Sequence, residues 1–495
     1  MTRRAMQHSP TPTGSIMKEE GVKTDPTDHL SLSEAAEIDY ERLVEMERVC
    51  VRKLDLAIAP LIGAFNFLSF IDRSNIGFAD TQGMSEDLNL KGDELNVAIS
   101  IFYVFYVLSE LPISMVAKRW RFERVLPTLT IAFGAVTLGS GWMTNYASLA
   151  ATRLVLGLFQ GCLFPCLALF VANWYKREEL AVRMAFLFAS SALAGAFGGL
   201  VAFGIYHMDG AAGIPGWRWI YIIEGSVTIA FGFVSFWLVP GSFETAWFLD
   251  DDDKVAMRRR AEAMHQYSGG RGHFGFKHIL WAAKDIKTWL HACLQFCVIT
   301  PLYGFNNFLP IIIEDGLGFS SVQAQYLVIP VQMWGAIVYM IIAWLSDRLQ
   351  RRYIFVMVFG SITALGYVLI LCPIPAGVQY FSTFLITTGM YIIAGINLSW
   401  ASLNSAPDGK RGATMGITLT LTDLAGVVVG QIYPSHDKPK YYLGNGWSLG
   451  TLVTALVLFT AVKKVYDHRN LNKRSEDDVQ GAEWDDRAGD FIYLT

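Results

Sequence analysis

The chain has 495 residues, of which 53% are hydrophobic and only 17% are charged. Soluble globular domains carry about a quarter charged residues, so this composition excludes an ordinary soluble protein and predicts a polytopic membrane protein. The formal net charge of −4 says little by itself, because the distribution of the charges matters more than their sum. We expect no nucleic-acid partner.

The six cysteines predict neither a disulfide framework nor a metal site, because none lies in a predicted outer loop. Two pairs, Cys162/Cys166 and Cys293/Cys297, are four residues apart inside apolar stretches, with no histidine beside them at metal-ligand spacing. We interpret them as small packing residues and expect no metal and no other cofactor.

Residues 1 to about 28 are rich in Ser, Thr, Pro and charge, and we expect them to be disordered. From Ser33 to Lys53 the pattern becomes helical, with Glu45 and Arg48 at turn spacing. This predicts a cytosolic helix that approaches the first span.

Twelve apolar stretches follow. The length of each is close to the number of residues, about 20, that a helix needs to cross a bilayer. They cover 55–74, 94–117, 124–143, 148–174, 180–206, 217–239, 288–313, 321–345, 353–372, 378–400, 412–433 and 446–463. We expect an all-α integral membrane protein with twelve transmembrane helices in two six-helix bundles. The expected division is an N-terminal tail with its approach helix, a first bundle, a central loop, a second bundle and a C-terminal tail: 1–53, 54–240, 241–287, 288–464 and 465–495.

Both long polar segments are expected on the cytosolic side. The central loop carries Asp250–Asp253 followed by Arg258–Arg260, which predicts a solvated amphipathic helix. The tail from Asp467 to Thr495 is short and acidic, and we expect it to be disordered.

Lys and Arg gather in alternate loops, which predicts that these loops face the cytosol. Both chain termini fall on that side, as an even number of spans requires. The basic residues are Arg48, Arg52, Lys53, Lys118, Arg119, Arg121, Arg124, Lys176, Arg177, Arg183, Arg348, Arg351, Arg352, Lys410, Arg411, Lys463 and Lys464.

Two glycine pairs occupy corresponding spans of the two halves: Gly195 and Gly199 in the fifth, Gly426 and Gly430 in the eleventh. Small residues four apart let two helices approach closely, as a rocking interface needs, although ordinary tight packing produces the same pattern.

The fourth span begins with Arg153 and carries Gln160 near its middle. A charged residue in a span is costly, about 3 kcal/mol at the centre, and normally faces protein or water. Arg153 therefore indicates a transport pathway. The alternative is an arginine that snorkels to the interface and marks the helix end.

The loop Ala343-Trp-Leu-Ser-Asp347-Arg348-Leu-Gln-Arg351-Arg352 resembles the loop motif of the major facilitator superfamily, with alanine in place of its first glycine. The equivalent loop of the first half, Lys118 to Arg124, lacks the motif's Asp. Three further segments resemble the fungal anion:cation symporter branch, which includes allantoate- and nicotinate-permease-like proteins. They are Asp72-Arg-Ser-Asn-Ile-Gly77, Asn173-Trp-Tyr175 and Gly216-Trp-Arg-Trp-Ile-Tyr-Ile-Ile-Glu224-Gly225.

Two positions depart from this branch. Gln160 stands where the branch usually has glutamate, and Asp423 stands in the eleventh span where it usually has asparagine. The titratable carboxylate has then either moved from the fourth span to the eleventh, or coupling differs altogether.

Further charged side chains of the spans are candidates for substrate binding or coupling. We expect Asp72, Arg73 and Arg153 to pair with one another at similar depth, either as an exchangeable pair or as a static structural bridge. Glu224 and Glu110 are buried carboxylates by position, with a structural role favoured for Glu110. In the second half we expect polar side chains on the cavity face, or in contact with neighbouring helices: Tyr303, Asn306, Gln332, Tyr391 and Asn397.

The resemblance implies a proton-coupled symporter for a small organic anion that works by alternating access between the two bundles. We expect a monomer in the plasma membrane. The alternatives are an exporter of a fungal metabolite, which the absence of proline between Gly195 and Gly199 disfavours, and a nutrient sensor, which the short tail disfavours. No enzymatic motif occurs, so we expect no enzyme.

Overall fold

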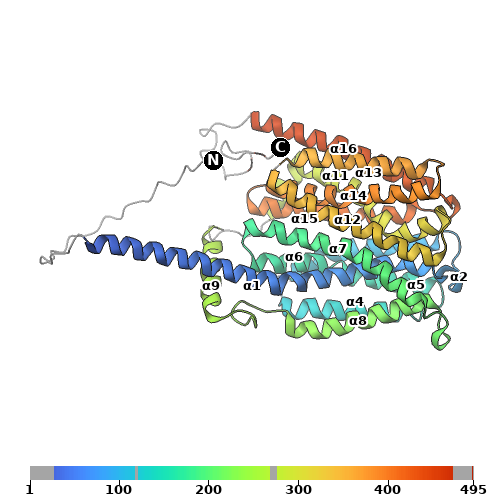
Figure 1. The fold of residues 1–495 in the computed structure, drawn as a ribbon, viewed down its shortest axis with the longest axis horizontal. Helices are drawn as coiled ribbons and strands as arrows, with labels where there is room; N and C mark the ends of the chain where they lie inside the picture. The colour runs from blue at the N-terminus through green and yellow to red at the C-terminus, as the bar shows by residue number, and fades with distance from the viewer. Residues whose placement is uncertain are drawn as a thin grey trace.

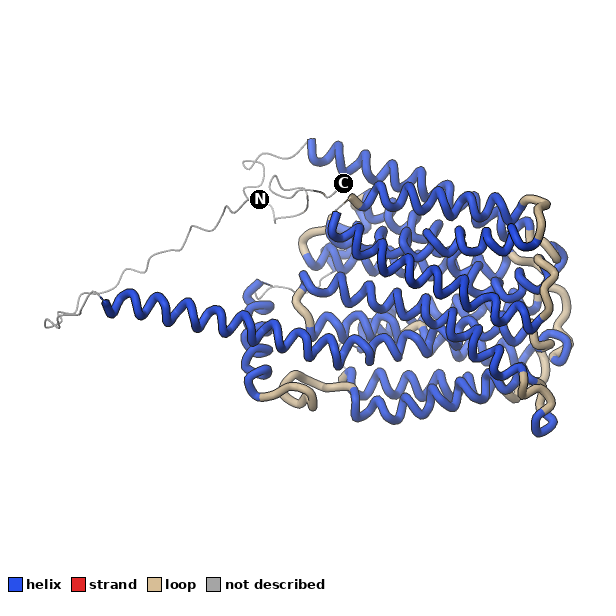
Figure 2. The backbone as a smooth tube through the Cα atoms, in the orientation of Figure 1, coloured by secondary structure: helices blue, strands red, loops and turns tan. Residues whose placement is uncertain are grey.

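The structure is a computed structural model, and it describes residues 27–117, 121–267, 276–349, 351–471, 486 and 493. In these residues all regular structure is helical and no strand occurs. Figures 1 and 2 show long helices that run side by side, with α1 (Thr27–Asp80) extending beyond the others at one end. A helix satisfies its own backbone hydrogen bonds, as a chain surrounded by lipid must.

The first half of the chain begins with α1, which joins the predicted approach helix and the first span without a break. The other long helices follow in chain order, with the short α2 and η1 between them: α2 (Met84–Asp87), α3 (Glu94–Ala117), α4 (Phe122–Ser140), α5 (Tyr146–Gln160), α6 (Leu163–Trp174), α7 (Arg177–Tyr206), η1 (Ala211–Gly213) and α8 (Gly216–Leu238).

Two helices of the central loop, α9 (Asp251–Tyr267) and α10 (Phe276–Lys284), precede the second half. The second half consists of α11 (Ile286–Ile311), η2 (Ile312–Gly316), α12 (Ser321–Leu349), α13 (Arg352–Leu371), α14 (Ala376–Leu403), α15 (Asp408–Ile432), η3 (Ser435–Asp437) and α16 (Tyr442–Leu471).

All twelve predicted spans are helical, which confirms the predicted fold class. Nine of the described helical stretches are long and apolar enough to cross a membrane, and the other three predicted spans form α3, α4 and α7. Large apolar side chains such as Leu56, Trp237 and Val457 are more than 60% exposed. Lipid tails cover such a surface at no cost.

The fourth predicted span is interrupted at Gly161 and Cys162, between α5 and α6. Pro165 has no N–H and cannot donate to the carbonyl four residues before it, at Gly161. A Cβ at Gly161 would lie 2.2 Å from the carbonyl oxygen of Tyr106, so α5 also presses closely on α3 here. The asparagine Asn145 caps α5, accepting a 2.9 Å hydrogen bond from the Ser148 amide.

The helices form two bundles. In the first half α4 packs on α8, α3 on α5, and α1 on α7; in the second, α13 packs on α14, and α11 on α15 and α16. The bundles meet mainly along two further helix pairs, α3 with α15 and α7 with α12, and α1 also contacts α11.

Both glycine pairs lie where the bundles meet. A Cβ on Gly426 would lie 2.0 Å from the ring of Tyr103, and one on Gly430 would lie 2.3 Å from Ser100 Oγ. On the other side, a Cβ on Gly199 would lie 2.9 Å from the Gln325 carbonyl oxygen. The prediction that these glycines permit close approach of helices is confirmed, and in both cases the neighbour belongs to the other bundle.

Two ends of the protein can be distinguished in Figure 1. We call the end with α9 and the C-terminal end of α16 the α9 end, and the opposite end with α2 the α2 end. The hydrogen bonds between the bundles lie toward the α2 end, where Asn96 Nδ2 donates to the Tyr433 carbonyl over 2.5 Å and Ser100 Oγ donates to the Val427 carbonyl over 2.9 Å. The described residues of the α9 half form no such bond between bundles.

The prediction of a fully solvated central helix is wrong for one face of α9. Asp253 and Arg260 are buried. Lys53 of α1 reaches Asp253 over 2.6 Å, and Arg260 reaches Glu179 of α7 over 2.5 Å. Helix α9 is amphipathic, as expected, but its charged face fastens it to α1 and α7, because each buried charge there has an oppositely charged partner.

The expectation of a disordered C-terminal tail is also wrong for its two described residues. Asp486 is 0% exposed and Tyr493 is 3% exposed. Both lie against the α9 end of the second bundle, where they contact α11, α15 and α16.

Candidate functional site

A cavity lies between the two bundles. The unfilled space between its walls is about 420 Å³, part of which is open to solvent. Helices α1, α3 and α7 line it on one side, and α11 and α12 on the other. The lining residues are Phe70, Arg73, Ser74, Phe78, Tyr103, Ser191, Gly195, Tyr303, Asn306, Asn307, Val328 and Gln332.

Arg73 is the cation of this cavity and is only 6% exposed. Its guanidinium carbon lies 4.7 Å from the ring centroids of Phe70 and of Tyr106, and the rings of Phe102, Tyr103 and Tyr303 lie within 5.7 Å. Aromatic faces stabilise a cation but do not neutralise it. None of the ion pairs between described residues includes Arg73, and its Nε has no hydrogen-bond acceptor there.

The predicted pairing of Asp72 is wrong for Arg73. Arg153 does act electrostatically on Asp72, but neither arginine joins a salt bridge in the described part of the chain. Asp72 and Arg73 are adjacent, so their side chains leave α1 about 100° apart. Arg73 reaches the cavity. Asp72 turns into the first bundle, where Thr137 Oγ1 donates to it over 2.8 Å.

Arg153 and Glu224 lie on the same side as Asp72, inside the first bundle. Arg153 donates a 3.1 Å hydrogen bond to the Tyr221 hydroxyl. Glu224 accepts a short hydrogen bond from Asn75 Nδ2, and its second carboxyl oxygen has no partner among the described residues. These polar groups hold α1, α4, α5 and α8 together, but none of them lines the cavity.

Three predicted residues of the second half form one network at the cavity. Gln332 Nε2 donates to Asn306 Oδ1 over 2.9 Å, and the Tyr391 hydroxyl lies 3.1 Å from both Asn306 Oδ1 and Gln332 Oε1. The single proton of Tyr391 can serve only one of these acceptors at a time. The network therefore has a free acceptor position that a ligand's donor or a water molecule can use.

The prediction that Asn397 faces the cavity is wrong. Six residues along a helix turn the side chain by about 240°, so Asn397 points away from the face of Tyr391. It is fully buried, 2.6 Å from both His291 Nδ1 and Gln295 Oε1. It joins α14 to α11 inside the second bundle.

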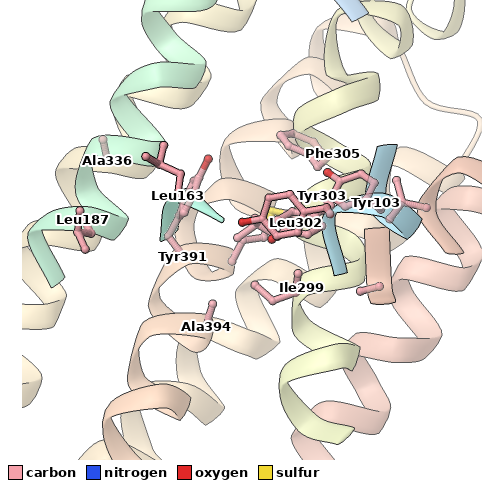
Figure 3. Close-up of a cluster of buried hydrophobic side chains, with 14 of the residues drawn as sticks. Tyr103, Leu163, Leu187, Ile299, Leu302, Tyr303, Phe305, Ala336, Tyr391 and Ala394 are labelled. Atoms are coloured by element: carbon pink, nitrogen blue, oxygen red, sulfur yellow. The ribbon is translucent and has the colours of Figure 1, made fainter. Parts of the chain in front are cut away.

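Asp423 lies at the interface and is 8% exposed. The hydroxyl of Tyr303 donates to it over 3.0 Å, and Glu110 of α3 is close enough to interact with it electrostatically. Tyr303 in turn stacks on Tyr103, with ring centroids 5.2 Å apart. Figure 3 shows these two tyrosines side by side, with Leu163, Leu187 and Tyr391 in the same buried cluster.

The tyrosines of α3 are functional candidates that were not predicted from the sequence, and Glu110, for which a structural role was favoured, lies beside them on the same helix face. A signal was present, because Tyr103, Tyr106 and Glu110 follow the i, i+3, i+7 spacing of one helix face. A polar aromatic stripe that ends in a carboxylate is unusual in a span. Gly426 supports the assignment, since α15 has no side chain where the Tyr103 ring lies.

The family model of the Major Facilitator Superfamily matches residues 62–430, which is most of the chain. The chain belongs to the major facilitator superfamily.

Relatives from fungi support this assignment. The chain is 40% identical over 448 residues to an uncharacterized transporter of Schizosaccharomyces pombe, covering 90% of this chain and 89% of the relative. It is 33% identical over 432 residues to the high-affinity nicotinic acid transporter of Saccharomyces cerevisiae, covering 87% of this chain and 80% of that one. The protein is thus a multi-pass membrane transporter and not an enzyme.

Solved structures of the superfamily share the fold. A proton:xylose symporter bound to 6-bromo-6-deoxy-D-glucose matches with a TM-score of 0.65 at 16% identity, over 82% of this chain and 94% of that chain. A bacterial homologue of the lysosomal transporter Spinster, inward-facing and occupied, matches with a TM-score of 0.61 at 14% identity, over 82% and 96%.

The remaining predicted positions of this facilitator lie away from the cavity. Gln160 is buried, and neither amide atom has a partner among the described residues. In the loop motif, Arg348 lies over the ring of Trp344 at 5.4 Å and Arg351 is exposed, whereas Arg352 is buried. The side chain of Asp347 lies outside the described residues.

Proposed function

We propose that the protein takes up a small organic anion together with protons. The observation that carries this proposal is Arg73, a buried cation in the cavity between the bundles without a carboxylate in salt-bridge distance in the described structure. Asp423 acts on Arg73 electrostatically but forms no salt bridge with it, so an anionic substrate in direct contact with the guanidinium would stabilise the buried charge further.

The surroundings of Arg73 favour a small planar carboxylate. The rings of Phe70, Tyr103 and Tyr303 offer flat apolar faces beside the guanidinium, and a guanidinium pairs with a carboxylate through two parallel hydrogen bonds. The amides of Asn306 and Gln332, across the same cavity, offer a donor and acceptors to the other end of the substrate. The similarity to a nicotinic acid transporter supports the same class.

The proposed proton site is the pair Glu110 and Asp423. Two buried carboxyl groups this close repel each other when both are ionised, so one of them would carry a proton. Arg73, Tyr103, Tyr106 and Tyr303 face this pair. The pair spans the bundle interface, from α3 to α15, so gain or loss of its proton would change the force between the bundles.

The sequence of events would be alternating access. In the described residues the bundles touch closely at the α2 end and form hydrogen bonds only there, as expected when the α2 end is closed. Basic residues, including Arg48, Lys176 and Arg183, lie toward the α9 end, which by the positive-inside rule faces the cytosol. We therefore propose an inward-facing arrangement in the plasma membrane with both termini cytosolic.

The deciding experiment is transport into liposomes that contain the purified protein. With an imposed pH gradient, acidic on the side the α2 end faces, radiolabelled nicotinate, allantoate or pantothenate should accumulate, and a protonophore should abolish the accumulation. Uptake that equilibrates but never exceeds the external concentration contradicts proton coupling. Transport only of uncharged or cationic compounds contradicts the role of Arg73 and the anion proposal with it.

Epitope insertion tests the orientation separately. Epitopes placed beside Asp253 and after residue 474 should be labelled only after the cells are permeabilised. Labelling of either epitope in intact cells contradicts the cytosolic assignment of the α9 end, whatever the substrate.

A further inference from the structure

The base of the second bundle, at the α9 end, contains a buried carboxylate from the C-terminal tail. Asp486 accepts a 2.9 Å bond from Lys410 of α15 and a short one from Lys287 of α11. Its backbone amide donates to the Ala406 carbonyl over 3.2 Å, and the Ala406 amide lies 3.4 Å from its carboxylate. One residue of the tail is thus bonded to α11, to α15 and to the segment between α14 and α15.

Among the described residues, Asp486 is one of only two carboxylates that face three cations in this cluster. Lys287 and Lys410 are 1% and 2% exposed, and both face a second carboxylate, Asp285, at 3.8 Å and 2.8 Å. Arg469 of α16 also reaches Asp285, over 2.7 Å. Without Asp486, three cations would share one carboxylate. Burial acts to raise the pKa of Asp285, but the hydrogen bond from Arg469 and the two lysine charges bring it below its ordinary value.

Tyr493, seven residues further along, makes a second contact that adjoins the ionic cluster, since Lys287 Nζ lies 5.2 Å from its ring centroid. Its ring stacks on Tyr466 of α16, with centroids 5.1 Å apart and planes at 13°. Its backbone exchanges two 3.0 Å hydrogen bonds with the side chain of Asn470. The tail is therefore recognised at two points, one ionic and one aromatic with specific backbone bonds.

We propose that the base of the second bundle is a receptor for the chain's own C-terminal tail, and that docking of Asp486 and Tyr493 joins α11, α15 and α16 into one body that moves as a unit during transport. The occupant is specified by the chemistry. A single carboxylate bonds both lysines, and a tyrosine seven residues later fits the ring of Tyr466. This inference concerns the stability and motion of the transporter and holds whatever the substrate is.

The physical reason for a strong effect is desolvation. Two buried ammonium groups that lose one of their two carboxylates must either draw in water or separate, and both loosen α11 from α15. The cavity at Arg73 is formed by other residues, so substrate affinity should change little. The turnover of transport and the thermal stability should both fall.

The test compares thermal unfolding of the purified full-length protein and three variants in detergent. Unfolding is followed with a thiol-reactive dye, because Cys50, Cys162 and Cys166 are buried. Asp486→Asn and a chain ending at Leu471 should lower Tm by about 6 °C or more. The matched control is Asp251→Asn, since Asp251 is a carboxylate 99% exposed at the same end; its Tm should equal that of the unchanged protein.

A peptide of residues 472–495 identifies the occupant. Added to the chain that ends at Leu471, it should restore Tm and transport rate, whereas the same peptide with Asp486→Asn should not. Recovery with anionic lipid vesicles but not with the peptide would mean that a headgroup is the occupant, which overturns the proposal. Equal Tm values for Asp486→Asn, Asp251→Asn and the unchanged protein overturn it as well.

If the shortened chain does not fold, a double variant decides the matter. Lys410→Met removes one of the two buried lysines that bond to Asp486. The double variant with Asp486→Asn and Lys410→Met should therefore show a smaller loss of Tm than the sum of the losses in the two single variants. Additive losses would show that the two side chains are not coupled, and the proposal would be wrong.

Discussion

Tyr103 of the first bundle and Tyr303 of the second stack across the interface, with centroids 5.2 Å apart and ring planes at 25°. Tyr303 also donates a hydrogen bond to Asp423, and both rings lie within 5.7 Å of the Arg73 guanidinium. The stacked pair thus links the proposed anion site, the proposed proton site and the surface along which the bundles move.

Tyr303→Phe keeps the stacked ring and removes the hydroxyl. Asp423 then loses the hydroxyl that donates a hydrogen bond to it. We expect the dependence of uptake on pH to change while the affinity for substrate stays within about threefold. The measurement is initial uptake rate against pH. Tyr303→Ala should lower the affinity for substrate as well. An unchanged pH profile for Tyr303→Phe would show that the hydroxyl has no part in proton coupling.

Asp423→Asn tests the coupling itself. The amide has the same shape but cannot bind and release a proton, so accumulation against a gradient should disappear. Exchange of internal for external substrate should persist, because exchange needs no net proton movement. Glu110→Gln should give the same result if the two carboxyl groups act as one site. Accumulation by Asp423→Asn with an unchanged pH profile would instead direct attention to Glu224.

Arg73→Ala should lower the affinity for the anion at least about 30-fold, corresponding to about 2 kcal/mol for a lost charge-assisted hydrogen bond, while the protein still folds. Arg73→Lys keeps the charge and should retain part of the binding. Binding is measured by substrate-induced protection in a thermal-shift assay. Wild-type affinity in Arg73→Ala would exclude Arg73 as the anion site.

Arg153 is the contrasting case, because its described partner is Tyr221 inside the first bundle. We expect Arg153→Ala to lower Tm more than it lowers substrate affinity, whereas Arg153→Lys retains some transport. Tm and affinity are measured on the same preparation. If Arg153→Ala keeps its Tm but loses substrate binding, Arg153 acts in the transport pathway and not in holding the first bundle together.

Gly426→Ala places a Cβ 2.0 Å from the Tyr103 ring, so α3 and α15 can no longer close at the α2 end. Overpacking of this kind costs about 1–3 kcal/mol and falls on the closed arrangement alone. A cysteine introduced beside Ser100 should therefore react faster with a reagent added from the α2 end. The control is Gly416→Ala in the same helix, where an added Cβ meets nothing within 4 Å. Equal reactivity in both variants would argue against this surface as the gate.

The positions of the spans could be read from local pattern alone. A run of about 20 apolar residues must become a helix in lipid, since its backbone groups have no other partners. Close helix contacts could be predicted for a similarly local reason at four glycines: Gly195, Gly199, Gly426 and Gly430. A helix face without Cβ atoms allows a neighbouring helix to approach more closely.

The partners of the polar side chains could not be read in this way. Asp72 and Arg73 are neighbours in sequence, yet one faces the interior of the first bundle and the other the cavity. Asp423 was predicted from the sequence to be a buried carboxylate. That it lies near Glu110 could not be predicted, because this depends on the packing of α15 against α3 of the other bundle. Asn397 was placed in the cavity, and it lies instead against His291.

The sequence by itself determined that the chain crosses a membrane many times, approximately where the spans lie, and which glycines touch a neighbour, because these follow from short-range backbone and hydrophobic requirements. Only the tertiary structure decided that Arg73 lacks a carboxylate partner among the described residues, that Glu110 meets Asp423, and that Asp486 returns from the tail to Lys287 and Lys410. Each of these depends on how whole helices are rotated and paired, and packing over hundreds of residues sets that arrangement.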